Sequence, residues 1–244
     1  MSLELKPVIL QKDLNKKSIA LKSLLDKTKT ATYLFYKYTG TYIDHLISSK
    51  DLENVTDYSY FLCNAKNMKK LELNVTAATT LYYAFATMES IEEIHLTSTK
   101  NVKNFTYTFS NCPKLHTITG LDLISNEYNI DSAFMNCPSL TNLSIKNIKH
   151  TTQLASTSGT AWGQNLSVES LINTCKECIN VGAARTLTIG TTNISKLANT
   201  YVKLIEEPEI DESNPKLPCE VCNSTTSGAI LISDYLALKN WTLA

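Results

Sequence analysis

The sequence predicts an α/β solenoid built from short repeats, with a period of 23–25, and closed by atypical terminal caps. The heptamer FSNCPKL at residues 109–115 returns as FMNCPSL at residues 134–140. Apolar residues recur at the same offsets in two earlier copies. Repetition at a fixed period is typical of proteins that stack one supersecondary unit on the next. The anchors of the four copies, at successive steps of 23, 24 and 25, are Leu62, Phe85, Phe109 and Phe134.

Each copy combines two kinds of hydrophobic spacing. The anchor and the apolar residue four positions before it are one helical turn apart, so together they predict a short helix. The positions nine and eleven residues after the anchor alternate with polar residues, and this predicts a strand, as in KLELN, EIHLT and NLSIK. A period of about 20 to 29 residues with this content is typical of a leucine-rich repeat.

Two further columns of the repeat hold polar or small residues. Asn64, Asn111 and Asn136 stand two positions after their anchors, where a buried Asn could bond to the backbone of a neighbouring turn. Cys112 and Cys137 occupy the next column, where the other copies have Ala and Met. We therefore expect these cysteines to be small core residues.

The regular repeats lie between segments that fit the pattern less well. We expect residues 1–48 to form a basic N-terminal cap or attachment segment and residues 49–150 to hold the repeats. Residues 151–206 should hold degenerate repeats, and residues 207–244 a capping helix and strand. The stretch ATYLFYKYTGTYIDHLI, which begins at residue 31, is either a degenerate first repeat or a cap. Terminal repeats are expected to be atypical, because one of their faces has no neighbour.

Helix and strand patterns return beyond the regular repeats. LSVESLINTCKECINV and GAILISDYLALKN have the apolar spacing of amphipathic helices, as does LQKDLNKKSIALKSLL near the N-terminus. TLTIG at 186–190 and WTLA at 241–244 alternate as strands do. We expect the last strand to close the far end of the stack, with Trp241 and Leu243 facing inward.

Composition and charge exclude several classes of protein. The 244 residues are 43% hydrophobic, so the chain can bury a sizeable core. Its 23 basic and 23 acidic side chains balance, so no overall field attracts nucleic acid or an anionic membrane. The N-terminus lacks the apolar region of a signal peptide, and no run of about 18 apolar residues could insert into a membrane. We expect synthesis in the cytoplasm and exit by another route.

The cysteines pose the question of a metal site. Seven is an odd number, and without a secretory context it favours reduced thiols. The pairs Cys175–Cys178 and Cys219–Cys222 have CxxC spacing, and four convergent thiolates could hold zinc. However, the segment between the pairs is long for a compact site, and the first pair falls on the apolar stripe of a helix. We expect no metal and no cofactor.

The motif F-x-N-C-P-x-L resembles BspA-like leucine-rich repeats, which occur in bacterial surface proteins and in phage structural genes. LSVESLINTCKECINVGAARTLTIGTTNISKL and the ending ALKNWTLA resemble the C-terminal part of tail proteins from phages and prophages of clostridia-like Gram-positive bacteria. The resemblance covers about residues 55 to 244. The chain departs from it at Asn240, where the family usually has Gly, and in the acidic insertion before the last helix. The resemblance implies no catalytic residue.

The outward positions of the predicted strands form the candidate binding surface. They are polar and low in charge, which suits a hydroxyl-rich or protein partner better than nucleic acid. Trp162 is a second candidate, which would either stack on a sugar face or pack beneath a degenerate turn. The two outward columns are Lys70, Glu93, Thr117 and Asn142, and Glu72, His95, Thr119 and Ser144.

No motif predicts catalysis. The chain has no GxSxG, HExxH or phosphate-binding glycine-rich sequence. Glu72 and His95 would be outward neighbours and could form an acid–base pair, although surface pairs are usually only solvated. We therefore expect a protein that is not an enzyme, with a cell-wall-degrading enzyme as the least favoured class.

These expectations combine into one functional hypothesis. The chain would be a non-enzymatic structural or receptor-binding component of a phage or phage-tail-like particle, at a tail fibre or baseplate periphery. Its partners would be other tail or baseplate proteins, through the N-terminal segment, and a bacterial surface glycan or protein, with a homo-oligomer as a further option. The alternative is a bacterial adhesin or protein-interaction module at the cell surface.

Overall fold

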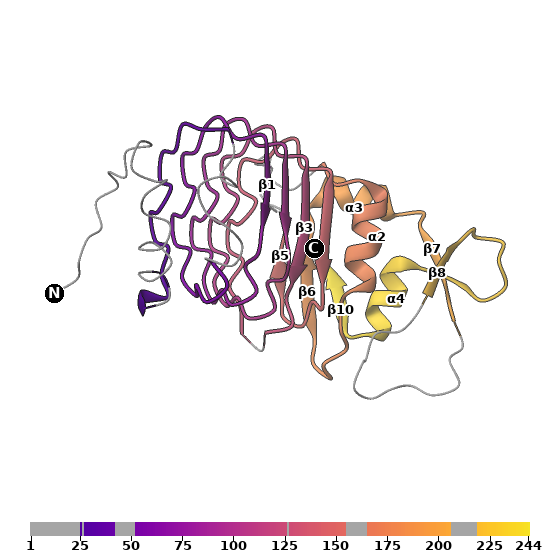
Figure 1. The fold of residues 1–244 in the computed structure, drawn as a ribbon. Helices are drawn as coiled ribbons and strands as arrows, with labels where there is room; N and C mark the ends of the chain where they lie inside the picture. Colours follow the sequence, from indigo (N-terminus) through magenta and orange to yellow (C-terminus); the bar gives the residue numbers. More distant parts are fainter. Residues whose placement is uncertain (1–24, 26, 42–51, 126, 155–164, 206–218) are drawn as a thin grey trace.

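The computed structural model describes residues 25, 27–41, 52–125, 127–154, 165–205 and 219–244. In these ranges the fold is mixed α/β, with three sheets and with helices gathered toward the C-terminal part (Figure 1). Residues 27–41 and 52–125 wind in successive coils that lie side by side along the molecule (Figure 1). The prediction of an α/β fold built on repeats is confirmed.

One sheet runs along the coils and contains one strand from each. Its strands are β1 (Lys70–Leu73), β2 (Glu93–Leu96), β3 (Thr117–Asp122) and β4 (Asn142–Lys146), paired in parallel in chain order. The strands fall where the alternating columns predict them, with one apolar face turned inward. The column nine residues after the anchor is buried throughout, at Leu71, Ile94, Ile118 and Leu143.

A β-bulge interrupts the register between β3 and β4. Ile118 pairs with Leu143, but Leu121 rather than Gly120 pairs with Ile145. Gly120 has φ of 87°, and a Cβ atom there would lie 1.7 Å from the backbone oxygen of Leu96. The third repeat therefore has one extra residue, which only glycine can supply. This explains why the column eleven residues after the anchor has no apolar residue in that copy.

The predicted helices of the repeats are not α-helices. The segments around the anchors are turns in which every second backbone N–H donates to the next coil, as from Tyr58 to Thr80 O (3.1 Å) and from Leu62 to Ala84 O (2.7 Å). The amides between them bond three residues back, as from Phe61 to Tyr58 O (3.0 Å). An α-helix would keep all these bonds within one segment. The spacing of apolar residues is alike in both structures, so it did not distinguish them.

Left-handed backbone makes this turn ladder possible. Asn64, Thr87, Asn111 and Asn136, two residues after the anchors, have φ between 56° and 63°. Asn tolerates this conformation better than other residues with a Cβ. The prediction that these asparagines are buried is wrong: none is buried, and Asn136 is exposed. Their role lies in the backbone, with one bond between side chains, from Asn136 Nδ2 to Asn111 Oδ1 (2.7 Å).

Stacked tyrosines offset part of the cost of this backbone. Tyr33, Tyr60, Tyr83 and Tyr107 have φ between 52° and 57° and stack with ring centroids 4.6, 5.1 and 4.6 Å apart. A left-handed residue costs roughly 1–2 kcal/mol, and an aromatic pair contributes about 0.5–1.5 kcal/mol.

The prediction of small core cysteines is confirmed, since Cys112 and Cys137 are buried. Their thiols donate to Phe85 O (3.2 Å) and Phe109 O (3.0 Å) of the preceding coils.

The ladder begins inside the segment expected to be a cap or attachment region. Amides of Ala31, Tyr33, Phe35 and Lys37 donate to the coil at residues 57–63. Phe35 is buried and packs edge-on against Phe61, with centroids 5.3 Å apart. Residues 31–37 therefore form a first repeat with its own anchor, and stacking begins earlier than the boundary at residue 49.

Beyond β4 the chain builds two further sheets. β5 (Thr152–Gln153), β6 (Arg185–Thr188) and β10 (Trp241–Leu243) form a parallel sheet in the order β10-β6-β5. β7 (Tyr201–Leu204), β8 (Cys219–Cys222) and β9 (Ala229–Leu231) form an antiparallel sheet in the order β8-β7-β9. The helices are α2 (Val168–Lys176), α3 (Thr191–Leu197) and α4 (Ile232–Leu238).

The terminal strand behaves as predicted. Trp241 is buried, its Nε1 donates to Ile179 O (2.9 Å), and Leu243 packs against the core. Asn240 has φ of 61°, a left-handed conformation that Gly and Asn adopt more readily than other residues. The antiparallel sheet and α3 were not predicted from the sequence.

A buried lysine ties α4 to the end of α2. The side chain of Lys239 is inaccessible to solvent, and its Nζ donates to Cys175 O (3.0 Å), Lys176 O (3.3 Å) and the Tyr235 hydroxyl (3.0 Å). The carbonyls at a helix C-terminus are suitable acceptors for a cation. Burial lowers the pKa of Lys239 from 10.5 to about 8.

We predict that Gly120→Ala destabilises the protein by at least about 2 kcal/mol, because the methyl group meets the Leu96 carbonyl at a left-handed residue. Gly182→Ala is the matched control: φ there is 71°, but no atom lies within 4 Å of the added carbon. That variant should lose only the roughly 1 kcal/mol of backbone strain. Urea denaturation measures both, and equal losses would contradict the bulge.

We predict that the stability difference between the parent protein and Lys239→Met increases as the pH rises from 8 to 10.5. The unfolded chain keeps the lysine proton up to about pH 10.5, whereas the folded chain releases it near pH 8. The unfolded state therefore binds more protons in this window, and raising the pH favours folding by up to roughly 3 kcal/mol. Urea titrations of both proteins under reducing conditions give this difference. The buried Cys and Tyr residues affect the stability of both proteins, so their contributions cancel. A flat difference would refute the lowered pKa of Lys239 in the folded protein.

Candidate functional site

The outward face of the first sheet brings most of the predicted binding residues together. The register aligns Lys70, Glu93, Thr117 and Asn142 in one row across four strands. It aligns Glu72, His95 and Thr119 in the neighbouring row. Ser144 was expected opposite Thr119, but the bulge at Gly120 shifts the register there. This surface is polar, and along the strands its outward side chains alternate with inward side chains that are buried.

On the β1 and β2 side of this face, the outward side chains form hydrogen bonds and ion pairs with one another and with Thr119. Lys70 Nζ pairs with Glu72 Oε1 at 3.0 Å and with Glu93 Oε2 at 3.7 Å. His95 bonds to Glu93 Oε2 (3.1 Å) through Nε2 and to Thr119 Oγ1 (2.8 Å) through Nδ1. The possible Glu72–His95 acid–base pair does not form, because His95 bonds to Glu93 and Glu72 pairs with Lys70. The bond from His95 lowers the pKa of Glu93, and the bond to Glu72 raises the pKa of Lys70.

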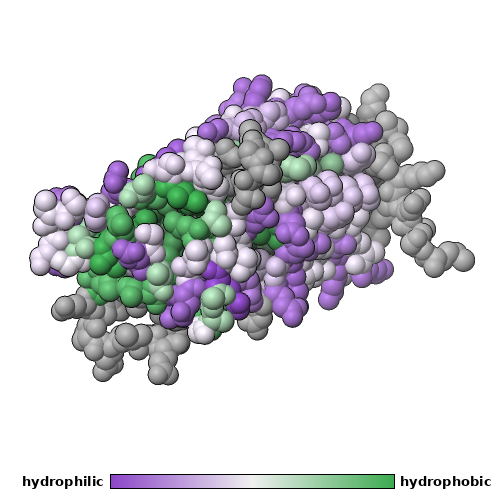
Figure 2. Space-filling view, turned by 180° about the vertical axis from the view of Figure 1, so that it is seen from behind, coloured by the Kyte–Doolittle hydropathy of each residue, from purple (hydrophilic) through white to green (hydrophobic). Residues whose placement is uncertain are grey.

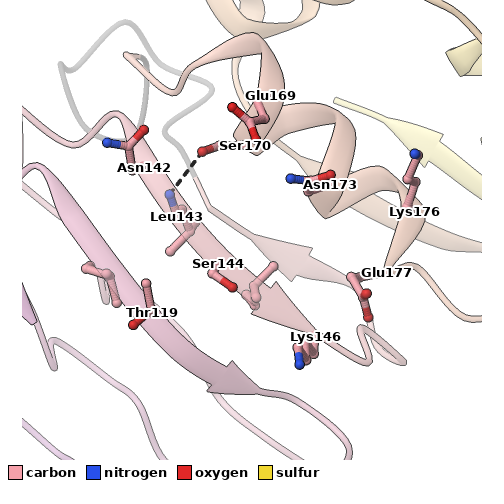
Figure 3. Close-up of a pocket in the computed structure, with 12 residues that line it drawn as sticks. Thr119, Asn142, Leu143, Ser144, Lys146, Glu169, Ser170, Asn173, Lys176 and Glu177 are labelled. Atoms are coloured by element: carbon pink, nitrogen blue, oxygen red, sulfur yellow. Dashed lines mark hydrogen bonds between the residues drawn. The ribbon is translucent and has the colours of Figure 1, made fainter. Parts of the chain in front are cut away.

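The other half opens into a groove between the last strand and α2. Its volume is about 430 Å³, and one wall is the end of the sheet while the other is the helix (Figure 3). Three predicted binding residues, Thr119, Asn142 and Ser144, line it. The remaining lining residues are Ile118, Leu143, Ile145 and Lys146 from the sheet and Glu169, Ser170, Asn173, Lys176 and Glu177 from the helix side.

Specific hydrogen bonds hold α2 beside β4. Ser167 caps the helix by accepting from Ser170 N (3.1 Å), and Ser170 Oγ accepts from Leu143 N of the strand (3.1 Å; Figure 3). At the far end, Glu177 Oε2 accepts from Asn147 N (3.1 Å). The apolar stripe of α2, which includes Leu171 and Cys175, is buried. The helix therefore occupies the place where a further strand of the sheet would lie.

Sequence reasoning missed the helical wall of the groove. Glu169, Asn173 and Lys176 lie four and three residues apart, so they share the face of α2 opposite its apolar stripe. This polar stripe is visible in the sequence, but nothing in the sequence states that it faces β4. Lys70, Glu72, Glu93, His95 and Thr117 lie on the sheet outside the groove lining. Trp162 lies outside the described residues.

The buried ammonium of Lys239 lies near the first CxxC pair and near Cys219 of the second. Burial raises the pKa of the Cys175 thiol to about 12 and also raises that of the Cys219 thiol. Lys239 interacts electrostatically with both of them and with Cys178. The positive charge of Lys239 disfavours a second cation beside these three thiols. In the ranges that the structure describes, no group of three or more His, Cys, Asp or Glu side chains could hold a metal ion.

A second surface feature lies at the C-terminal end. Leu204, Ile205, Val221 and Leu238 are 36% to 53% exposed. Figure 2 shows hydrophobic residues gathered at this end of the molecule, whereas most of the remaining visible surface is hydrophilic. Exposed apolar patches commonly mark interaction sites. Among the described helices, none is long and apolar enough to cross a membrane.

Comparison with known families agrees with the coils. Residues 28–158, just over half of the chain, match the BspA type leucine rich repeat region in six copies. The chain belongs to this family. The matched range begins close to the first hydrogen-bonded coil at residues 31–37. Families of leucine-rich repeats are typically non-enzymatic interaction modules. Neither the search of curated proteins nor the search of solved structures finds a match.

Proposed function

We propose that this protein is a non-enzymatic binding module whose repeats form one solenoid with a cap at each end. The groove between β4 and α2 carries the proposal, because it joins outward residues of the repeats to a polar helix face in one concave site. Hydroxyl, amide and backbone groups dominate the lining, with lysines and glutamates at its margins. Such a lining suits a protein or a hydroxyl-rich partner.

The proposed setting is a phage or phage-tail-like particle, at a tail fibre or baseplate periphery. The support is the resemblance of the stretch from residue 166 to 197 and of the ending ALKNWTLA to phage tail proteins. These segments form α2, β6, α3 and β10, which pack around the far end of the repeats (Figure 1). The chain would be made in the bacterial cytoplasm and assembled there into the particle. Its groove would face a glycan or protein of the bacterial surface.

Attachment to other tail or baseplate proteins would use the N-terminal segment, whose stretch 1–30 carries seven lysines. Oligomers of the chain would use the same segment. Family membership favours one alternative, an adhesin or protein-interaction module at the bacterial surface. The two settings differ in the assembly to which the protein is attached.

The expected result in the producing bacterium is that the protein co-sediments with tail particles after lysis. Quantitative mass spectrometry of purified particles and of the cell-wall fraction measures this. A constant ratio to a major tail protein supports the particle setting. Recovery in the cell-wall fraction alone would contradict it and support the adhesin.

We predict that charge reversal of Lys12, Lys16, Lys17 and Lys22 to Glu removes the protein from particles while its melting temperature stays unchanged. The reason is that basic side chains on an attachment segment need acidic partners. Val221→Asp in the apolar patch is the contrasting variant, because it alters the opposite end. If Val221→Asp blocks incorporation and the reversal does not, the orientation is the reverse of the proposed one.

A further inference from the structure

A column of stacked tyrosine rings runs along the turn ladder. Tyr33, Tyr60, Tyr83 and Tyr107 occupy the same position in four successive coils, two residues before the anchor. Their ring centroids are 4.6, 5.1 and 4.6 Å apart, which is close to the spacing of about 4.8 Å between paired backbones. None of the four residues is buried. The stack therefore presents ordered aromatic rings at the surface of the repeats.

The stack ends one coil before the ladder does. The fifth coil has Ser132 at the tyrosine position, with φ of 53°, which lies within the 52° to 57° of the four tyrosines. Tyr107 N donates to Asp131 O of that coil (3.1 Å), so the coil continues in register. Tyr107 stacks on Tyr83, and no other described aromatic ring lies against it. The short side chain of serine leaves the place of a fifth ring open.

Three polar side chains stand around this open place. Ser132 lies below it, and Thr106 and Asp131 come directly before the stack position in the fourth and fifth coils. Asn104 Oδ1 accepts from Thr106 N (2.9 Å) and Asn129 Oδ1 accepts from Asp131 N (2.7 Å), which fixes the backbone of both. In the described part of the chain, the three side chains make no hydrogen bond or ion pair. Two hydroxyls and a carboxylate are therefore available to a ligand beside an aromatic face.

We propose that the open face of Tyr107 binds one pyranose ring of a neutral glycan, which takes the place of a fifth ring in the stack. The C–H groups on the face of a pyranose are weakly positive and suit the negative face of an aromatic ring. Sugar hydroxyls both donate and accept, so they suit the side chains of Thr106, Asp131 and Ser132. This site is separate from the groove between β4 and α2, and it adds a second binding surface to the proposed module.

The surroundings favour a neutral sugar over other rings. An anionic ligand, such as a nucleotide, would place its charge beside the like charge of Asp131. The ring of a proline or phenylalanine would stack, but its rim has no group for the carboxylate and the two hydroxyls.

The platform is also held in place before any ligand binds. Tyr82 packs edge-on against Tyr83 and Tyr60, with centroids 4.7 and 5.5 Å apart, and so supports the stack from the side. Tyr83 in turn stacks on Tyr107. Binding to such a surface loses little side-chain freedom.

Titration of the full-length protein with neutral tetrasaccharides tests the proposal. The probes are β-linked tetramers of glucose, of mannose and of N-acetylglucosamine, each observed by proton NMR of the sugar. At least one tetramer should bind, with upfield shifts of its C–H protons, because these lie over the ring of Tyr107. Tyr107→Ser should weaken this binding about tenfold.

Tyr33→Ser is the matched control for the loss of a ring. It removes the tyrosine at the other end of the stack, which also has one stacked neighbour at 4.6 Å. Sugar binding should be unchanged in this variant. Both variants are titrated well below their melting temperatures, so that a difference between them reports the position of the ring.

Ser132→Tyr supplies the fifth ring from the protein itself, on backbone that tyrosine already adopts in four coils. This variant should melt at a higher temperature than the parent, because it gains a stacked pair, and it should no longer bind the sugar. Loss of binding together with increased stability cannot arise from misfolding. Ser132→Gly is the control that leaves the place open, and it should retain binding within about threefold.

The inference is overturned if none of the three tetramers binds, or if the sugar binds Ser132→Tyr as well as the parent. A melting temperature of Ser132→Tyr that does not rise would also overturn it, because the place would then not fit a ring. Tetraproline is titrated in the same way, and its binding in the absence of any sugar binding would assign the face of Tyr107 to polypeptide.

Ser144→Trp separates this site from the groove that carries the proposed function. It fills the groove and should leave sugar binding unchanged, whereas loss of binding in this variant but not in Ser132→Tyr would place the sugar in the groove. Association with tail particles does not depend on Tyr107. If the protein co-sediments with tails but no sugar binds at Tyr107, this inference fails while the proposed function stands.

Discussion

The structure depends on a backbone ladder between neighbouring coils, which requires left-handed residues at two fixed places in each repeat. Every second amide around an anchor donates to the next coil, as from Leu81 to Asn104 O (2.9 Å) and from Phe85 to Thr108 O (2.9 Å). These bonds fix the distance and register from coil to coil on the side opposite the sheet. They leave the anchors buried, so one core runs through the stack. The strands then pair in parallel because the coils already stand in register.

The position of the groove follows from this arrangement. The ladder keeps β1 to β4 in order, and the bulge at Gly120 adjusts β3 against β4. β4 is left as an edge strand, which natural proteins usually cover or block. Here α2 covers part of the edge through Ser170 and Glu177. Buried Lys239 bonds to the last carbonyls of α2 and links this helix to α4 and the terminal strand.

The sequence predicted the features that depend on local apolar spacing. The columns around Phe109 and Phe134 identified the repeat and its strands, because burial of the same positions recurs in each coil. The same spacing did not predict the turn ladder, since the burial pattern of a helix and that of these turns are alike. The recurring Asn column was the available clue to left-handed backbone, but Asn at these positions also suggests a buried side chain that bonds to a neighbouring turn. The sequence did not reveal the bulge, because one extra residue in a single repeat changes only the column eleven residues after its anchor.

The candidate site was predicted on one side only. Thr119, Asn142 and Ser144 follow from strand alternation, which is local. Asn173 and Lys176 join them through a contact between α2 and β4, which are well separated in the sequence, and no periodicity encodes such a contact. Likewise, the partner of His95 could not be chosen between Glu72 and Glu93 without the side-chain conformations. Long-range placement and rotamers are the parts that required the structure.

The most direct test of this account compares Asn136→Gly with Asn136→Ala. Asn136 is exposed with φ of 56°, and both substitutions remove the same bond to Asn111, so only the backbone differs between them. The turn ladder predicts that the Gly variant is more stable than the Ala variant by about 1 kcal/mol, because alanine is strained in left-handed backbone. An α-helix at this place predicts the opposite sign, with Ala more stable by about 1 kcal/mol. Urea denaturation decides the sign, and a more stable Ala variant would contradict the ladder.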